Sequence, residues 1–433
     1  MVREFLLALF GFYLVLAAAV GMAQDKTPPV KTFVPIYDEA KVPTYDLPPI
    51  LNFKADSVEE IRAAWDVRRA ELLKVFTEEM YGSYPTSPFE LDCREVESGP
   101  AFGGKALRQQ FNVTVKTAHG SLGIGLLVYS PTNSTGRVPC FLGLNFRGNH
   151  TVNADPAILI PESWVPDDRD SGVVQNKSTE AGRGTRRHRW ECELLIDHGC
   201  AIATAYCGEI DPDFDDQFQN GIHALFPEHR PSSTHPDRWG SIAAWSWGLS
   251  RLLDCIEQKV ETVDPRRVIV MGHSRLGKTA LWAGATDTRF AGVISNNSGC
   301  GGAALSRREF GETLWRINDS FPHWFCGNFT KYSNNEGQLP FDQHQLLALV
   351  APRQLYVASA SKDLWADPKG EFIATQLAGE LYQQLGGQPL GLSEFPQPNT
   401  ASIGQVSYHL RDGEHNVLAW DWKNYIEFAK LLK

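Results

Sequence analysis

The hydrophobic pattern changes twice within the first third of the chain. Residues 24 to about 50 are rich in proline and lysine and lack periodicity, which predicts an extended segment. In residues 57–80 the apolar side chains recur at helical steps, which predicts an amphipathic helix. In residues 89–130 polar and apolar side chains partly alternate, and this pattern is typical of antiparallel strands.

After Pro139, short apolar runs alternate with helical segments. Candidate buried strands are residues 140–146, 201–206, 268–271, 292–295 and 354–358, and candidate helices are residues 245–259 and 278–285. Alternating strands and helices predict a mostly parallel sheet with helices on both faces, a three-layer αβα sandwich. No repeat or linker divides the chain, so residues 24–433 are expected to form one α/β domain with an N-terminal extension.

The first 23 residues have the features of a signal peptide. Arg3 precedes an unbroken apolar run, Phe5–Val20, and small residues suit cleavage after Ala23. The run is long enough for a retained membrane anchor, but no basic cluster follows it. We therefore expect cleavage, a secreted or periplasmic protein, and no membrane attachment afterwards.

Charge and cysteine spacing argue against several partners. The 433 residues carry a formal net charge of -10 without a basic stripe, so nucleic acid is not an expected partner. An exported protein permits disulfides among its eight cysteines, but their pairing cannot be deduced and no zinc-site spacing occurs. Cys140, Cys207 and Cys255 lie in apolar runs and are interpreted as small buried hydrophobic side chains.

An acidic cluster occurs at Asp211, Asp213, Asp215 and Asp216. A calcium loop needs a more regular ligand spacing and a glycine at its sharp turn. The cluster is therefore interpreted as a solvated loop, and no metal site is expected.

The strongest chemical motif surrounds Ser274. A β-branched strand runs through Gly272 to Ser274 and then into a helix of small residues, which is the context of a nucleophile elbow. The match is imperfect, because Leu276 replaces the usual second glycine and Gly277 follows it. An ordinary serine N-cap is the alternative. We predict an α/β-hydrolase fold with Ser274 as nucleophile and Arg275 facing the oxyanion.

The general base should follow the nucleophile in the chain. His415 lies in a polar, glycine-containing loop before a terminal helix and is the preferred base. His409, at the end of an apparent strand, is the second choice. His344, at a helix start, is interpreted as structural, and His323 as structural or as part of the rim of the site.

The acid should follow a late strand. Asp363 comes shortly after the strand predicted near residues 354–359 and is well placed to orient His415. Asp367 precedes a proline and is interpreted as a turn residue. The predicted triad is therefore Ser274, His415 and Asp363.

From about residue 140 onwards, the chain resembles the bacterial glucuronoyl esterases of carbohydrate esterase family 15. The segments that carry the resemblance are 272–278, 297–302, 324–325, 363–365 and 413–415. The resemblance implies a metal-free serine hydrolase that cleaves esters between glucuronic or 4-O-methylglucuronic acid branches of xylan and lignin alcohols. It also implies that Arg275 stabilises the oxyanion, that Lys278 and Glu312 bind the sugar, and that Trp365 lines the pocket.

One position departs from the family pattern. Many members carry a glutamate as the triad acid where this chain has Asn297, so the acid role falls to Asp363. We expect a monomer without a cofactor that acts on a small or polymeric uronate ester. A different secreted serine esterase, such as a xylan deacetylase, and an inactive carbohydrate-binding module remain alternatives, and an intact triad argues against the second.

Overall fold

The amphipathic pattern near the N-terminus forms the helix that it predicts. In the computed structural model, which describes residues 33–52 and 57–432, helix α1 (Val58–Phe76) begins after Ser57. The Oγ of Ser57 accepts the backbone N–H of Glu60 at 3.2 Å, which satisfies one of the free donors of the first turn. A π-helical turn (Thr77–Tyr81) continues the helix.

The predicted signal peptide, residues 1–23, lies outside the described residues. Within the part of the chain that the structure describes, no helix has the length and hydrophobicity needed to cross a membrane.

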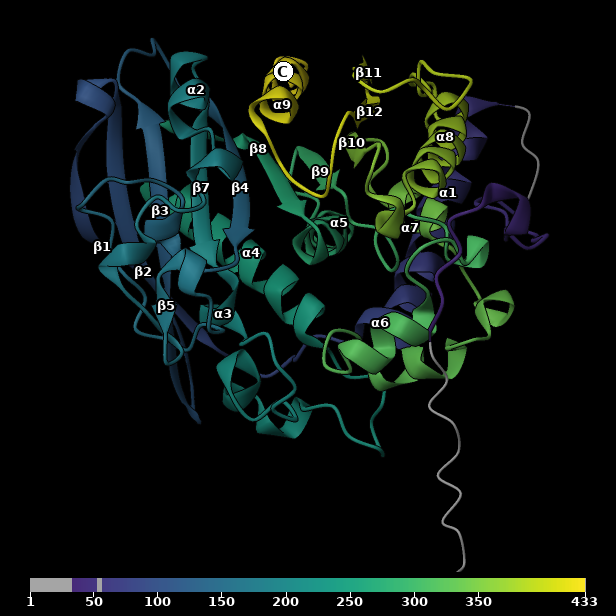
Figure 1. The fold of residues 1–433 in the computed structure, drawn as a ribbon, viewed down its shortest axis with the longest axis horizontal. Coiled ribbons are helices and arrows are strands. Elements are labelled where there is room, and N and C mark those ends of the chain that lie inside the picture. Colours follow the sequence, from purple (N-terminus) through teal and green to yellow (C-terminus); the bar gives the residue numbers. More distant parts are fainter. Residues whose placement is uncertain (1–32, 53–56, 433) are drawn as a thin grey trace, which may run out of the picture. The chain divides into compact units, whose positions relative to one another are not determined.

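One large sheet runs through the molecule and joins an antiparallel part to a parallel part (Figure 1). The antiparallel part is the predicted segment 89–130, and its last strand, β3, pairs antiparallel with β7 of the parallel part. In spatial order the strands are β1 (Glu90–Ala101), β2 (Ala106–Thr117), β3 (Gly120–Pro131), β7 (Ala201–Tyr206), β4 (Val138–Asn145), β8 (Val263–His273), β9 (Gly292–Asn296), β10 (Gln354–Ala360), β12 (Val406–Arg411) and the short antiparallel β11 (Thr400–Ser402). A separate small hairpin pairs β5 (Val173–Val174) with β6 (Lys177–Ser178).

Helices cover both faces of the sheet, as the alternation of strands and helices predicts. Helices α4 (Ser241–Lys259), α5 (Arg275–Thr286) and α8 (Pro368–Gln384) pack against one face, and α2 (Cys192–Asp197) and α9 (Ala419–Ala429) pack against the other. Three further short helices are α3 (Cys207–Ile210), α6 (Leu314–Ser320) and α7 (Gln343–Ala348), of which α7 packs on α5 and α8.

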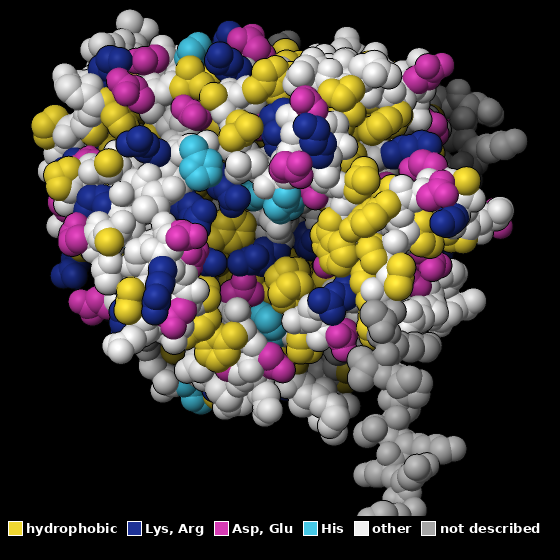
Figure 2. Space-filling model, in the orientation of Figure 1, with side chains coloured by type: hydrophobic (Ala, Val, Ile, Leu, Met, Phe, Trp, Pro, Cys, Tyr) yellow, Lys and Arg dark blue, Asp and Glu magenta, His cyan; other side chains and the backbone are white. Residues whose placement is uncertain are grey.

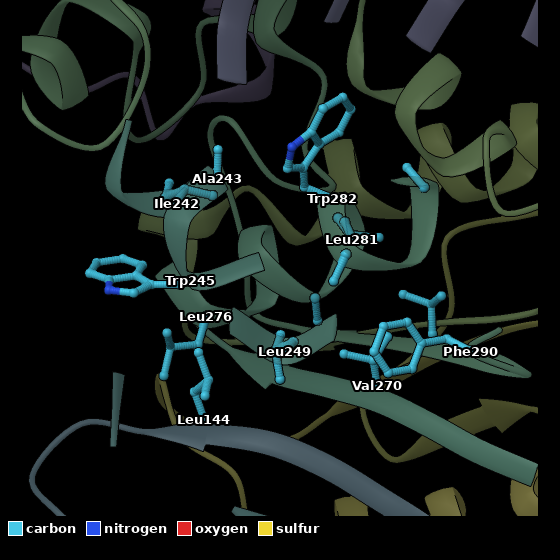
Figure 3. Packing of buried hydrophobic residues seen from close by; sticks show 14 of the residues in the cluster. Leu144, Ile242, Ala243, Trp245, Leu249, Val270, Leu276, Leu281, Trp282 and Phe290 are labelled. Carbon is cyan, nitrogen blue, oxygen red and sulfur yellow. The ribbon is translucent and has the colours of Figure 1, made fainter. Parts of the chain in front are cut away.

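Alternate residues of the buried strands build a separate core on each face. In β8, Val268 and Val270 belong to the core that contains α4 and α5, whereas Ile269 and Met271 belong to the core that contains α2 and α9. Figure 3 shows Val270 of the first core beside Leu249 of α4 and residues of α5. A strand buried on both faces explains why its sequence is continuously apolar.

Cys255 is buried, as its interpretation as a small hydrophobic side chain predicts, but it is not a free thiol. Cys255, in α4, forms a disulfide with Cys93 of β1, and 162 positions of sequence separate the two residues. Cys140 and Cys207 are buried, as expected, and both are free thiols. The apolar surroundings of Cys255 predicted its burial correctly, but sequence holds no sign of a partner so far away.

Candidate active site

Ser274 sits on a sharp turn between β8 and α5. Its backbone has φ 59° and ψ −131°, a conformation that is strained for any residue with a side chain. A Cβ atom on Gly272 would lie 1.9 Å from the carbonyl oxygen of Leu276, so this position requires glycine. The turn thus has the geometry of a nucleophile elbow despite Leu276. It also places Ser274 beside the free N–H groups of the first turn of α5.

His415 and Asp363 come together at the same edge of the sheet as Ser274. Asp363 follows β10 and His415 follows β12, and these parallel strands are neighbours. The His415 Nδ1–H donates to Asp363 Oδ2 at 2.6 Å, because an ionised carboxylate can only accept. The Asp363 side chain is 5% exposed and that of His415 is 40% exposed. His415 lines two cavities together with Ser274.

Asn297, at the position where many family members carry a glutamate, supports the predicted acid Asp363. Its Nδ2 donates to Asp363 Oδ2 at 2.8 Å, and its backbone N–H donates to the carbonyl of Ala358 at 2.7 Å. Asn297 has a φ of 48°, a conformation that asparagine adopts more readily than most residues. One carboxylate oxygen therefore accepts from both His415 and Asn297.

The cavity on one side of Ser274, here called the lysine cavity, contains the predicted sugar-binding residues. It has a volume of about 310 Å³ and is lined by Ser274, His415, Lys278, Glu312 and Trp365 among others. The Trp365 side chain is accessible from the cavity, since the residue is 37% exposed. The backbone N–H of Glu312 donates to the carbonyl of Trp365 at 3.0 Å.

Lys278 and Glu312 influence each other's ionisation inside the lysine cavity. Burial lowers the pKa of Lys278, and the charge of Glu312 opposes this shift. Burial raises the pKa of Glu312, and Lys278 opposes that shift in turn. The Lys278 Nζ also donates to the carbonyl of Ser298 at 2.5 Å. The cavity thus offers a donor and an acceptor that burial keeps away from bulk water.

A second cavity, here called the arginine cavity, lies on the other side of Ser274. Its volume is about 290 Å³, and its lining includes Ser274, Arg275, His415, His273, Phe146, Arg147, Arg186, Arg189, Trp190 and Trp422. Figure 2 shows a hollow near the middle of one face in which basic and histidine side chains gather beside hydrophobic ones. The segments 145–150 and 186–189 contribute several of these residues.

Arg275 is held rigidly beside Ser274. Its Nε lies 2.6 Å from Asp213 Oδ2, and its guanidinium lies 4.6 Å from the ring centre of Phe146 and 5.7 Å from that of Trp324. Burial alone would raise the pKa of Asp213, but Arg275, His323 and Trp324 lower it to about 2. Asp213 therefore remains a carboxylate and keeps Arg275 in place.

The interpretation of the acidic cluster as a solvated loop is wrong for two of its members. Asp213 binds Arg275, and the buried Asp211 accepts from His223 Nδ1 at 2.8 Å. Their partners lie elsewhere in the sequence, so the cluster looked like a surface loop. Among the described residues, no group of three or more His, Cys, Asp and Glu side chains could hold a metal ion.

Glu371 of α8 is a functional neighbour that sequence reasoning missed. Its carboxyl accepts the backbone N–H of Gly299 at 2.9 Å and the hydroxyl of Ser359 at 2.5 Å. Burial raises the pKa of Glu371 to about 8, although these hydrogen bonds oppose the shift. It anchors the turn that begins with Asn297. A glutamate in a helical pattern gives no signal that it faces the core.

The other candidates have structural roles. His409 is buried in β12, and His344 hydrogen-bonds the carbonyl of Pro48 at 2.9 Å. Asp367 caps α8 by accepting the N–H of Gly370 at 2.9 Å. His323 is paired with Asp213 at 3.1 Å. The preference for His415 over His409 and for Asp363 over Asp367 agrees with this geometry.

Comparisons with known proteins agree on carbohydrate esterases. The family model described as glucuronyl esterase, fungi, matches residues 231–386. A carbohydrate esterase from an unknown prokaryotic organism is 47% identical over 394 residues, which cover 91% of each chain. A 4-O-methyl-glucuronoyl methylesterase of Podospora anserina is 36% identical over 34% of this chain and 32% of its own length.

Solved structures extend the likeness to nearly the whole chain. A promiscuous CE15 esterase from a marine bacterial metagenome is 46% identical with a TM-score of 0.85, over 92% of this chain and 100% of that chain. A glucuronoyl esterase from Solibacter usitatus is 41% identical with a TM-score of 0.83, over 91% of this chain and 99% of that chain.

Proposed function

Since this chain belongs to the glucuronoyl esterases of carbohydrate esterase family 15, we propose that it hydrolyses esters of glucuronic or 4-O-methylglucuronic acid through an acyl-enzyme on Ser274. The observation that carries the proposal is the meeting of Ser274 with the His415–Asp363 pair at a cavity that also holds Lys278 and Glu312. The groups proposed for acyl transfer and those proposed for sugar binding thus line the same cavity.

The proposed reaction has two steps. In the first, the Ser274 Oγ attacks the ester carbonyl carbon while His415 takes its proton, and the alcohol then leaves with that proton. In the second, His415 activates a water that attacks the acyl-enzyme, which releases the uronic acid and restores the Ser274 hydroxyl. Asp363 holds the imidazole in the required tautomer and stabilises its cation.

Arg275 and the N-terminus of α5 are suited to stabilise the oxyanion. The guanidinium is fixed by Asp213 and by two aromatic rings, so little reorganisation is needed when negative charge develops. The N–H groups of the first turn of α5 lie beside Ser274 and carry the positive end of the helix dipole.

The lysine cavity fits a sugar that bears no charge until it is cleaved. A uronate ester presents hydroxyl groups rather than a carboxylate, and hydroxyls can both donate and accept. Lys278 and Glu312 supply the complementary donor and acceptor, and the half-exposed ring of Trp365 offers a face for stacking.

We further propose that the protein acts outside the cytoplasm as a monomer. The apolar segment of residues 1–23 supports export, and a wall polymer such as glucuronoxylan could reach the enzyme only there. The proposed reaction uses side chains of this one chain and needs no cofactor.

The test is substrate hydrolysis with a matched pair of esters. We expect the protein to release methanol from methyl glucuronate much faster than it releases acetate from acetylated xylan, because an acetyl group contacts none of the sugar-binding residues. A fluorophosphonate probe should label the wild type, and Ser274→Ala should abolish both labelling and turnover.

Preferential release of acetate would instead favour a xylan deacetylase. Absence of labelling in the folded wild type would contradict the hydrolase proposal altogether.

A further inference from the structure

The arginine cavity carries more positive charge than its partners neutralise. Arg147 and Arg186 share one carboxylate, Asp168, at 3.2 and 2.8 Å. Arg275 is paired with Asp213. Four guanidinium groups line the cavity, whereas two carboxylates pair with them, so two positive charges remain in formal excess.

Arg189 is the cation that lacks a carboxylate partner among the described residues. Its Nε donates to the amide oxygen of Asn416 at 2.8 Å, which leaves the terminal nitrogens available. Burial lowers the pKa of Arg189 to about 10, and the neighbouring charges of Arg186, Arg147 and Arg275 add to this shift. The fold therefore holds a half-buried guanidinium among other cations, an arrangement that disfavours the empty cavity and favours an anion within it.

Aromatic side chains form another part of the same wall. Phe146 and Trp190 line the cavity together with the arginines, and the fully buried Trp422 packs against Trp190. Trp422 is fixed, because its Nε1–H donates to the backbone carbonyl of Arg189 at 2.9 Å. A planar ring with an anionic substituent matches this combination of rigid aromatic and guanidinium groups.

The position of the cavity indicates which half of a substrate it meets. An ester bound at Ser274 extends in two directions, toward its acyl group and toward its alcohol. The lysine cavity takes the uronate under the proposed function, and the arginine cavity opens from the same serine on the other side. His415, which must protonate the departing alcohol, lines both cavities.

Resting on the proposed function, we propose that the arginine cavity binds the alcohol half of the ester and prefers aromatic alcohols that carry an anionic group such as a carboxylate. Arg189 supplies the unneutralised charge, and the aromatic wall supplies the ring contact. The reaction remains ester hydrolysis, in which water adds and the alcohol leaves with the proton from His415.

The test compares two isosteric leaving groups. Glucuronate esters of 3- and 4-carboxybenzyl alcohol are measured against the corresponding carbamoylbenzyl esters, which have the same shape without the charge. We expect kcat/KM for the better carboxylated ester to exceed that of its neutral isostere about tenfold at low salt, and the ratio to shrink as salt screens the contact.

Variants locate the preference. Arg189→Gln should bring the ratio close to one, whereas Arg189→Lys, which restores a cation, should recover part of it. Arg187→Gln is the matched control, because Arg187 is exposed and does not line the cavity. It should keep the wild-type ratio.

A wild-type ratio near one for both ring positions would overturn the inference, as would an unchanged ratio in Arg189→Gln. Methyl glucuronate separates this failure from failure of the proposed function. If the wild type hydrolyses the methyl ester but shows no charge preference, the inference alone is wrong. If the wild type hydrolyses neither the methyl ester nor the benzyl esters, the proposed function itself has failed.

Discussion

Two histidine–aspartate pairs lie near the end of the sheet, and their surroundings separate their roles. The first joins His409 Nε2 to Asp421 at 2.8 Å, and the second joins His415 Nδ1 to Asp363 at 2.6 Å. His409 is fully buried, and its Nδ1 accepts from the hydroxyl of Tyr356 at 2.9 Å. His415 is partly exposed, and its Nε2 forms no hydrogen bond to another described residue.

The comparison shows that a histidine–carboxylate pair is not in itself catalytic. A pair with both ring nitrogens occupied can only hold structure. A general base needs one nitrogen fixed by its orienting carboxylate and the other free to face the reacting hydroxyl. The same chemical unit therefore serves packing at His409 and, as proposed, proton transfer at His415.

The largest expected effect comes from breaking the second pair. Asp363→Asn should lower kcat on methyl glucuronate by about 10⁴-fold, because the amide no longer holds His415 in the required tautomer. Thermal unfolding should change little, since this side chain lies beside a cavity. Full activity in Asp363→Asn would refute the assignment of the acid.

The corresponding substitution in the first pair, Asp421→Asn, should lower stability and leave kcat nearly unchanged. Asp421 also pairs with Arg411 at 3.0 Å, so Asp421→Asn leaves a buried cation without its partner. We expect the free energy of unfolding to fall by about 3 kcal/mol. At a temperature where the variant is folded, kcat should stay close to wild type. A loss of kcat as severe as in Asp363→Asn would show that the two pairs are not functionally distinct.

A smaller effect should follow from removing the amide that supports the pair of Asp363 and His415. Asn297→Gly keeps the positive φ without strain and deletes the donor to Asp363. We expect kcat to fall about tenfold with little change in KM, since one hydrogen bond to a charged group is lost.

A double mutant distinguishes positioning from general damage. In the Asp363→Asn background, Asn297→Gly should have little further effect on kcat, because its partner is already gone. Additive losses would mean that Asn297 acts independently of Asp363.

The smallest effect concerns proton binding by the structural pair. Burial lowers the pKa of His409, although Asp421 opposes the shift. As the pH falls through about 6.5, the unfolded chain therefore binds a proton that the folded chain excludes, and the contribution of His409 to stability declines.

The protonation of His409 can be followed by NMR of protein labelled at histidine Cε1. The His409 signal should stay at its neutral position between pH 7.5 and 6. A midpoint at or above 6.5 would contradict burial of a neutral ring.

Local pattern was sufficient to predict the strands, the strained turn at Ser274 and the approach of Asp363 to His415. Val268–Met271 is continuously apolar because both faces are covered, and the elbow is short enough for Gly272 and Ser274 to be read together. Asp363 and His415 were found because each follows a strand, and parallel strands bring their carboxyl ends to one edge.

Long-range partners could not be predicted in the same way. Asp213 looked solvated because its partner, Arg275, is distant in sequence, and Cys255 gave no sign of Cys93. Asn297 and Glu371 act through hydrogen bonds between separate loops and helices, which no periodicity records. Pattern identifies what is buried, whereas pairing depends on how elements pack.

At Ser274 the backbone conformation that the proposed function needs lowers the stability of the fold. Its φ of 59° is one that glycine would adopt freely, whereas a residue with a side chain holds it at a cost of about 1–3 kcal/mol. A variant with glycine at position 274 would lack the hydroxyl but would not carry this energetic cost. The rest of the fold thus holds the Ser274 side chain in this conformation. Selection for higher stability alone would favour glycine at position 274.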